Sequence, residues 1–167
     1  MKESARGKMN LYLLRHGRAA ERDARRFPDD SQRPLLAKGQ DRIHRLAAAF
    51  PALAVRSDRI VSSPYRRAAE TMTCLQEAAG AFPMESRVDL MPDGRPAQVD
   101  LWLRGLMAEA SAEEVFVLIS HQPFLSDLVF HLTGRDVDAK KASCTVIKWE
   151  SPGWRYERHY QPAELRG

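Results

Sequence analysis

The stretch VFVLISHQPFLSDLVFHL, residues 115–132, carries the pattern that decides the fold. Its first five residues are continuously apolar, which is typical of a strand buried on both faces. The apolar residues that follow the proline recur at helical spacing, and Gly134 stands where a helix would end. A strand buried on both faces and followed directly by a helix is the repeating unit of an α/β layer fold.

The same alternation extends outward in both directions. Short strands are predicted at 9–14 and 58–63, a brief one near 85–88, and a terminal hairpin at 144–150 and 154–159. Amphipathic helices are predicted from Leu36, from Pro64 and around Trp102. The sequence therefore predicts an α/β fold, a three-layer α/β/α arrangement around a mainly parallel central sheet.

Length and composition favour one soluble domain. The chain has 167 residues, enough for a core without metals or disulfides. We expect a flexible N-terminal tail at 1–8, a single domain over 9–160 and a C-terminal tail at 161–167. The two cysteines, Cys74 and Cys144, form no CxxC pair, so a cytoplasmic protein is expected. No apolar run is long enough for a membrane span, so no membrane partner is expected.

The charge balance favours acidic ligands. The net charge is +4 at pH 7, which suits phosphates or nucleic acid. Nucleic acid is the weaker expectation because the sequence lacks motifs that interleave aromatic and basic residues. The sequence also lacks a Walker loop, HExxH and clustered carboxylates, so no cofactor and no metal are expected.

Three predicted strands end in polar residues that suit phosphate chemistry. The first ends in Arg15-His16-Gly17, the second leads through SSPY to Arg66 and Arg67, and the long apolar strand ends at His121. If these strands are neighbours, their carboxyl ends place the groups at one edge of the sheet, where α/β folds bind ligands.

Each of these residue types has a chemical use there. Arginine grips a phosphate with two parallel hydrogen bonds. A histidine beside two arginines is disfavoured as a cation, so His16 should be neutral near pH 7 and able to act as a nucleophile. Gly17 is expected to let a ligand approach the backbone. Ser62 and Ser63 are interpreted as turn and cap residues.

These segments resemble the histidine phosphatase superfamily. LLRHGRA at 13–19 is similar to its RHG signature, SSPYRRAAETM at 62–72 to its SPxxRAxQT segment, and VLISHQPF at 117–124 to its second-histidine segment. RPLLAKG at 33–39 resembles the SixA-type branch of small phosphohistidine phosphatases. The resemblance implies a phosphoglycerate mutase-like fold without a large cap domain.

The resemblance also implies a role for each matching residue. His16 matches the nucleophile that becomes phosphohistidine, and Arg15 the adjacent phosphate-binding arginine. Counting from Ser63 in the SPxxRA frame gives Arg67, and not Arg66, as the second phosphate arginine. His121 matches the second pocket histidine. These four would be the catalytic residues.

Two features depart from the family pattern. Arg18 stands where relatives often carry an acidic or smaller polar residue, and it would add positive charge for substrate binding at the pocket rim. No residue matches the family's general acid confidently; Asp89 and Asp93 are the candidates. A weak acid position favours cleavage of a P–N bond, because an imidazole leaves well once its own ring is protonated.

The sequence thus predicts a cofactor-independent phosphohistidine phosphatase acting on a protein, for example a histidine phosphotransfer domain of a signalling relay. Two alternatives stay open: a phosphatase of small phosphorylated metabolites, and a phosphate-binding module without turnover. We expect a monomer.

Overall fold

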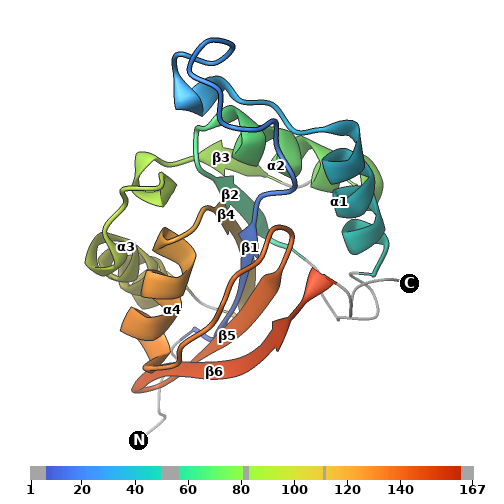
Figure 1. Cartoon of the computed structure of the whole chain (residues 1–167). Helices are drawn as coiled ribbons and strands as arrows, with labels where there is room; N and C mark the ends of the chain where they lie inside the picture. The colour runs from blue at the N-terminus through green and yellow to red at the C-terminus, as the bar shows by residue number, and fades with distance from the viewer. Residues whose placement is uncertain (1–6, 50–56, 81–82, 111, 163–167) are drawn as a thin grey trace, which may run out of the picture.

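The computed structural model of the chain describes residues 7–49, 57–80, 83–110 and 112–162 (Figure 1). Within these ranges six strands form one sheet in the order β3-β2-β4-β1-β5-β6. The first four in that order pair in parallel, and β5 and β6 add an antiparallel edge. The strands are β1 (Met9–Arg15), β2 (Arg59–Ser62), β3 (Met84–Ser86), β4 (Glu114–Ser120), β5 (Cys144–Glu150) and β6 (Gly153–Tyr160).

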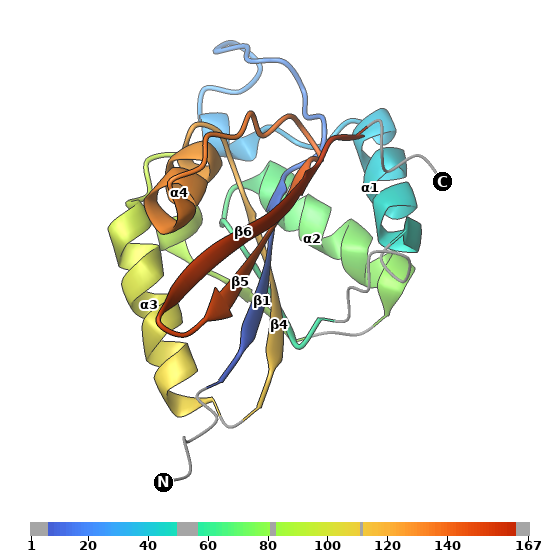
Figure 2. The same cartoon turned by 90° about the horizontal axis from the view of Figure 1, so that it is seen from below.

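Helices cover both faces of the sheet, as the two views show (Figures 1 and 2). One face carries α1 and α2, and the other carries α3 and α4. The predicted three-layer α/β/α fold is therefore confirmed, and no additional domain is inserted in the described ranges. The helices are η1 (Asp30–Gln32), α1 (Ala37–Ala49), α2 (Arg66–Ala79), η2 (Val88–Leu90), α3 (Pro96–Glu109) and α4 (Phe124–Thr133).

Burial on both faces explains why the central strands are continuously apolar. In β1, Tyr12 and Leu14 pack into the core beneath α1 and α2. Leu11 and Leu13 alternate with them and pack into the core beneath α3 and α4. Successive side chains of a strand point to opposite faces, so a strand between two helical layers needs apolar residues at every position.

The prediction near 85–88 was partly wrong. The strand β3 ends at Ser86, and Val88 starts the short helix η2. Leu90 at the end of that turn is fully buried in the core, and its carbonyl accepts a hydrogen bond from Ser120 Oγ. Leu90 packs into the core beneath α3 and α4.

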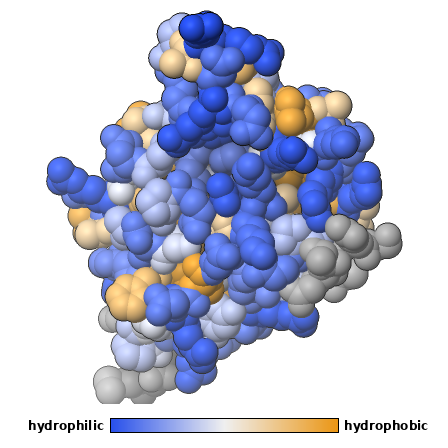
Figure 3. All heavy atoms as spheres, in the orientation of Figure 1, coloured by the Kyte–Doolittle hydropathy of each residue, from blue (hydrophilic) through white to orange (hydrophobic). Residues whose placement is uncertain are grey.

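The predicted tails fall mostly outside the described residues. Of the N-terminal tail, only Gly7 and Lys8 are described; Gly7 is buried, and the Lys8 carbonyl accepts a 2.9 Å hydrogen bond from Glu114 N. The domain boundaries therefore stay a prediction. Among the described residues, no helix combines the length and apolar character that crossing a bilayer requires. The face seen in Figure 3 is mainly hydrophilic, with apolar residues in separate spots.

Candidate active site

Three strand ends meet at one edge of the sheet, as the sequence predicts. Arg15 pairs with Ser120 across β1 and β4, and Ser62 pairs with Ile119 across β2 and β4. The three strands therefore end at one level. The rings of His16 and His121, which follow β1 and β4, lie with their centroids 5.1 Å apart.

The hydrogen bonds of His16 define its tautomer. Its Nδ1 lies 2.7 Å from the Gly17 carbonyl oxygen, which can only accept, so Nδ1 carries the proton. Arg67 Nε donates to Nε2 at 3.3 Å, which requires a lone pair on that nitrogen. Both contacts indicate a neutral ring whose Nε2 lone pair faces the pocket. That is the form in which an imidazole is a nucleophile.

The surroundings keep His16 neutral. The pKa of His16 is lowered to about 3, mainly because the ring is buried and then because Arg67, Arg15 and Arg33 disfavour a further positive charge. The hydrogen bond to Gly17 acts in the opposite direction but does not outweigh them. The neutrality predicted from the arginines is correct, although burial contributes more.

His121 is also buried and neutral. Its Nε2 lies 2.7 Å from Ser63 Oγ, and its ring meets Tyr65 edge-on at a centroid distance of 5.1 Å. Its pKa is lowered to about 2, first by burial and then by His16, Arg67 and Arg15. Its Nδ1 is buried without a hydrogen-bond partner among the described residues.

Arg67, and not Arg66, belongs to the site. Arg67 is buried on the first turn of α2, where the helix N-terminus favours anions. Its Nη1 donates to the Asp30 carbonyl at 2.9 Å, and its Nη2 to Asp30 Oδ2 at 3.2 Å. Arg66 is exposed and pairs with Glu70 at 2.7 Å. These contacts support the assignment counted from Ser63, which stays a prediction.

Arg15 completes the group of cations. Its Nη1 donates to the Ala139 carbonyl at 3.0 Å, whereas its Nε is buried without a partner in the described part of the chain. A buried polar atom without a hydrogen bond costs roughly 1–3 kcal/mol. Arg15 Nε and His121 Nδ1 are two such atoms at the edge of the sheet where β1 and β4 end. Two buried nitrogen atoms without partners there favour a ligand that offers several oxygen acceptors.

Gly17 and Arg18 are placed beside the pocket. A Cβ on Gly17 would lie 3.1 Å from Ile43 and 3.2 Å from the Gly39 carbonyl oxygen. The glycine therefore lets β1 pack closely against α1, which differs from the predicted approach of a ligand. Arg18 is exposed, and its carbonyl accepts a hydrogen bond from Leu36 N. Their roles in substrate binding stay predictions.

The two candidate general acids differ in their surroundings. Asp89 lies in η2 and forms an ion pair with Arg87 at 2.6 Å. Asp93 is exposed in the loop before α3. Neither contacts His16 or His121 through a hydrogen bond within the described residues. A role as general acid therefore stays a prediction for both.

Sequence reasoning missed the contacts of three residues, Asp30, Ser63 and Thr71, with the proposed catalytic groups. Asp30 holds Arg67 and also accepts from Arg33 Nε at 2.7 Å. Ser63, interpreted as a cap, places its Oγ 2.7 Å from His121 Nε2 and also accepts a hydrogen bond from Tyr65 N at 3.2 Å. Thr71 Oγ1 accepts from Gly17 N at 3.1 Å and donates to the Arg67 carbonyl at 2.7 Å. Only Thr71 left a signal, because it stands one helical turn after Arg67.

One group of side chains outside the pocket resembles a metal site in composition. His44 of α1 and Cys74 and Glu77 of α2 bring their ligand atoms within 4.8 Å of one another. The carboxylate of Glu77 already lies 3.1 Å from His44 Nε2. Burial, followed by Glu77 and Glu70, raises the pKa of Cys74 to about 11, which disfavours the thiolate that a metal would need. We assign this cluster to the packing of α1 against α2.

Comparisons with known sequences agree with the geometry. The family model of the histidine phosphatase superfamily (branch 1) matches residues 11–91. An uncharacterized protein of Picosynechococcus is 33% identical over 156 residues, 90% of each chain. The phosphohistidine phosphatase SixA of Escherichia coli strain K12 is 30% identical over 128 residues, 74% of each chain.

Solved structures give the same result. The protein histidine phosphatase SixA complexed with tungstate has a TM-score of 0.83 at 26% identity, covering 94% of this chain and 99% of that one. A phosphoglycerate mutase from Bacillus anthracis, 13% identical, has a TM-score of 0.77 and covers 98% of both chains, which shows the shared fold. With the phosphatase signature placed at three adjacent strand ends, the chain belongs to the histidine phosphatase superfamily and is of the SixA type.

Proposed function

We propose that this phosphatase removes phosphate from a phosphohistidine carried by a signalling protein, such as a histidine phosphotransfer domain, through a phospho-His16 intermediate. One observation carries the proposal. A buried, neutral His16 presents its Nε2 lone pair beside Arg67, next to unpartnered donor positions on Arg15 and His121.

In the first step His16 Nε2 attacks the phosphorus atom of the substrate. A bond forms between Nε2 and phosphorus, and the P–N bond to the substrate imidazole breaks. The electron pair of that bond stays on the leaving nitrogen, and because the substrate ring is already protonated at its other nitrogen, it departs as a neutral imidazole. Arg15, Arg67 and His121 hold the equatorial oxygens, where phosphoryl transfer concentrates its charge.

In the second step water attacks phospho-His16. The P–N bond to Nε2 breaks, inorganic phosphate leaves, and the neutral imidazole is restored. The Gly17 carbonyl keeps Nδ1 protonated through both steps and so keeps the same nitrogen directed at phosphorus. The nucleophile and the charge stabilisation come from the chain's own side chains, so the activity should need no added metal.

The choice of substrate rests on three supports. An imidazole leaving group needs less help from a protein acid than an alkoxide does, and Asp89 is engaged by Arg87. The E. coli relative is named a phosphohistidine phosphatase. The SixA structure bound tungstate, a tetrahedral oxyanion with the shape of phosphate.

The setting of the enzyme is also proposed. Both cysteines, Cys74 and Cys144, are free and buried, which fits a reducing cytoplasm where signalling phosphohistidines occur. No large insertion covers the strand ends in the described ranges, which suits a phosphoryl group carried on a protein surface. We propose that the monomer is the active form.

The deciding experiment is paired. The purified protein, without added metal, is given a phosphohistidine-bearing phosphotransfer domain and, separately, a panel of small phosphate esters. We expect phosphate release from phosphohistidine, weak release from esters, and loss of both in His16→Ala.

Each other outcome selects an alternative. Rapid ester turnover that depends on His16 would keep the mechanism and move the substrate to small metabolites. Asp89→Asn and Asp93→Asn would then show whether an acid is used. No turnover of any substrate, with phosphate still bound, would leave a binding module and contradict the proposal.

A further inference from the structure

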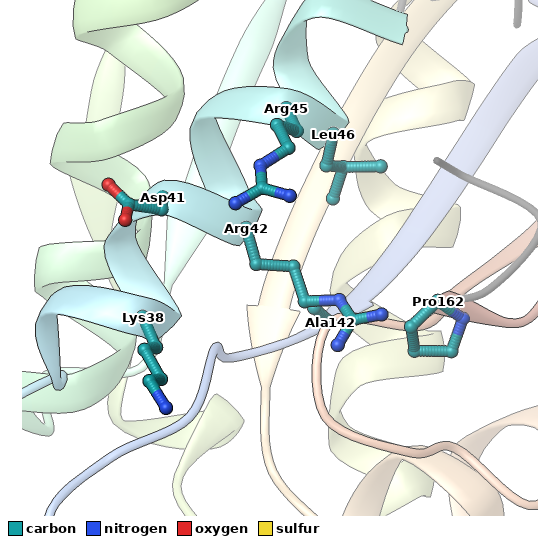
Figure 4. Close-up of a pocket in the computed structure, with 7 residues that line it drawn as sticks. All are labelled: Lys38, Asp41, Arg42, Arg45, Leu46, Ala142 and Pro162. Atoms are coloured by element: carbon teal, nitrogen blue, oxygen red, sulfur yellow. The ribbon is translucent and has the colours of Figure 1, made fainter. Parts of the chain in front are cut away.

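A hollow of about 530 Å³ lies between α1 and the end of the described chain (Figure 4). Three cations of α1 line it at one-turn and two-turn spacing, so they share one helix face. In Figure 4 Arg42 extends toward Ala142 and Pro162, whereas the Asp41 carboxylate points to the other side. The cations are Lys38, Arg42 and Arg45.

A second hollow of about 520 Å³ continues the first, because Arg42 and Pro162 line both. It adds Lys140 and Lys141 and reaches the catalytic Arg15. We call the two hollows together the basic groove. It extends from Arg15 to the face of α1 that carries Lys38, Arg42 and Arg45.

Within the described residues, no carboxylate forms an ion pair with the lysines and arginines of the groove. Several surface arginines elsewhere in the described chain pair with a carboxylate, Arg66, Arg104 and Arg155 among them. None of the five groove cations has a carboxylate oxygen within 4.0 Å among the described residues. The described lining residues hold one carboxylate, that of Asp41, against five cations besides Arg15, so the groove favours a ligand of negative charge.

The loop that carries Lys140 and Lys141 is hydrogen-bonded to the end of β1. Ala142 has φ 60°, a left-handed conformation that is rare for a residue with a Cβ. Its N–H lies 3.2 Å from the carbonyl oxygens of both Arg15 and His16. Backbone strain of this kind persists only where the surroundings impose it. Lys140 and Lys141 are therefore held in a set position relative to the site.

The shape of the groove favours an extended acidic peptide. Lys38 and Arg45 are seven residues apart on α1, about 10 Å along the axis, which is the length of about three extended residues. The residues lining it include no aromatic side chain, so bases of a nucleic acid would find no stacking platform.

We infer that the basic groove binds an acidic segment flanking the phosphorylated histidine of the partner protein, while the phosphoryl group enters the pocket beside Arg15. The inference rests on the proposed function for the identity of the phosphorylated group. Apart from Arg15, the residues that line the groove take no part in the proposed chemistry, so the groove contributes to partner choice and to association rate.

Binding of defined peptides tests the inference without requiring turnover. Two fluorescein-labelled dodecapeptides carry a central phosphoryl-triazolylalanine, a stable mimic of phosphohistidine. One has Asp and Glu flanks, and the other has Asn and Gln in their place. By fluorescence anisotropy at low ionic strength, the acidic peptide should bind about tenfold more tightly, and added salt should remove the difference.

Matched variants locate the effect. Arg42→Glu with Lys141→Glu should abolish the preference, and the milder Arg42→Gln with Lys141→Gln should reduce it. The control, Lys8→Glu with Arg135→Glu, makes the same charge change at exposed positions away from the groove and should retain the preference. The inference would be overturned if the two peptides bind with equal affinity. It would also be overturned if the control variant loses the preference for the acidic peptide as fully as the groove variant does.

The outcomes also separate this inference from the proposed function. If phosphohistidine is not hydrolysed but the acidic peptide keeps its advantage, only the proposed substrate fails. If phosphohistidine is hydrolysed and flanking charge has no effect, only the groove inference fails. A single-stranded RNA dodecamer serves as the comparison for nucleic acid. If the RNA binds more tightly than the acidic peptide and the groove variant no longer binds it, the partner of the groove is a nucleic acid and the inference is wrong.

Discussion

Acid should destabilise this protein because its two pocket histidines are neutral in the fold. An unfolded histidine has a pKa near 6.5, whereas the pKa of folded His16 is about 3. Between these values the unfolded chain binds a proton that the folded chain does not. Unfolding then takes up a proton, so the free energy of unfolding falls as pH falls. The stability is fully present above about pH 6.5 and is lost progressively toward pH 3.

The magnitude follows from the size of the shift. Each pH unit inside the window changes the free energy of unfolding by about 1.4 kcal/mol per histidine. Over two units below pH 6.5, His16 alone accounts for about 3 kcal/mol. His121, whose pKa is about 2, adds a similar amount. Their sum is a large part of the roughly 5–15 kcal/mol that stabilises a typical domain.

The assay is urea unfolding followed by tryptophan fluorescence, at about one-unit steps from about pH 7.5 to about 4.5. Carboxylates also titrate in this range and affect both proteins alike. The quantity of interest is therefore the free energy of unfolding of the unaltered protein minus that of His16→Asn. We expect that difference to fall by about 1.4 kcal/mol per pH unit below pH 6.5. A difference that does not vary with pH would refute the reasoning. A difference that rises as pH falls would mean that folded His16 is protonated.

Three further predictions concern the pocket and its support. Arg67→Lys should lower kcat/KM at least about 100-fold, whereas Arg66→Lys, one residue away but exposed, should leave it within about twofold. Ser63→Ala should lower kcat/KM about tenfold with the fold intact by circular dichroism, because His121 Nε2 loses its partner. Gly39→Ala should lower the urea midpoint, costing about 1–3 kcal/mol, because a Cβ there would meet a backbone oxygen at 2.2 Å.

The fold could be predicted because its signals are local. The apolar run of β4 and the helical spacing of α4 each identify an element within one short window. The catalytic edge then follows from topology, since parallel strands place their carboxyl ends together. His16 and His121 were therefore proposed without knowledge of the sheet order, which the structure gives as β2-β4-β1, whereas the choice of Arg67 over Arg66 came from the family resemblance.

The supporting residues could not be predicted because they depend on the path of loops. Asp30 is 37 positions before Arg67 and lies in a short turn whose sequence shows no periodicity. Arg33 belongs to the RPLLAKG stretch that carries the family resemblance, yet its hydrogen bond to Asp30 depends on how the loop between them folds. Contacts between a loop and a helix terminus are set by tertiary packing, which leaves no pattern in a single segment.

Burial of the histidines connects the stability of this protein with its chemistry. A module that only binds phosphate would gain from a protonated His16, since a third cation would strengthen its hold on a dianion. This pocket instead keeps His16 and His121 neutral, at a cost in acid stability. A protonated Nε2 has no lone pair and cannot attack phosphorus. A neutral ring is therefore needed where His16 Nε2 forms a bond to phosphorus, and this favours turnover over binding alone.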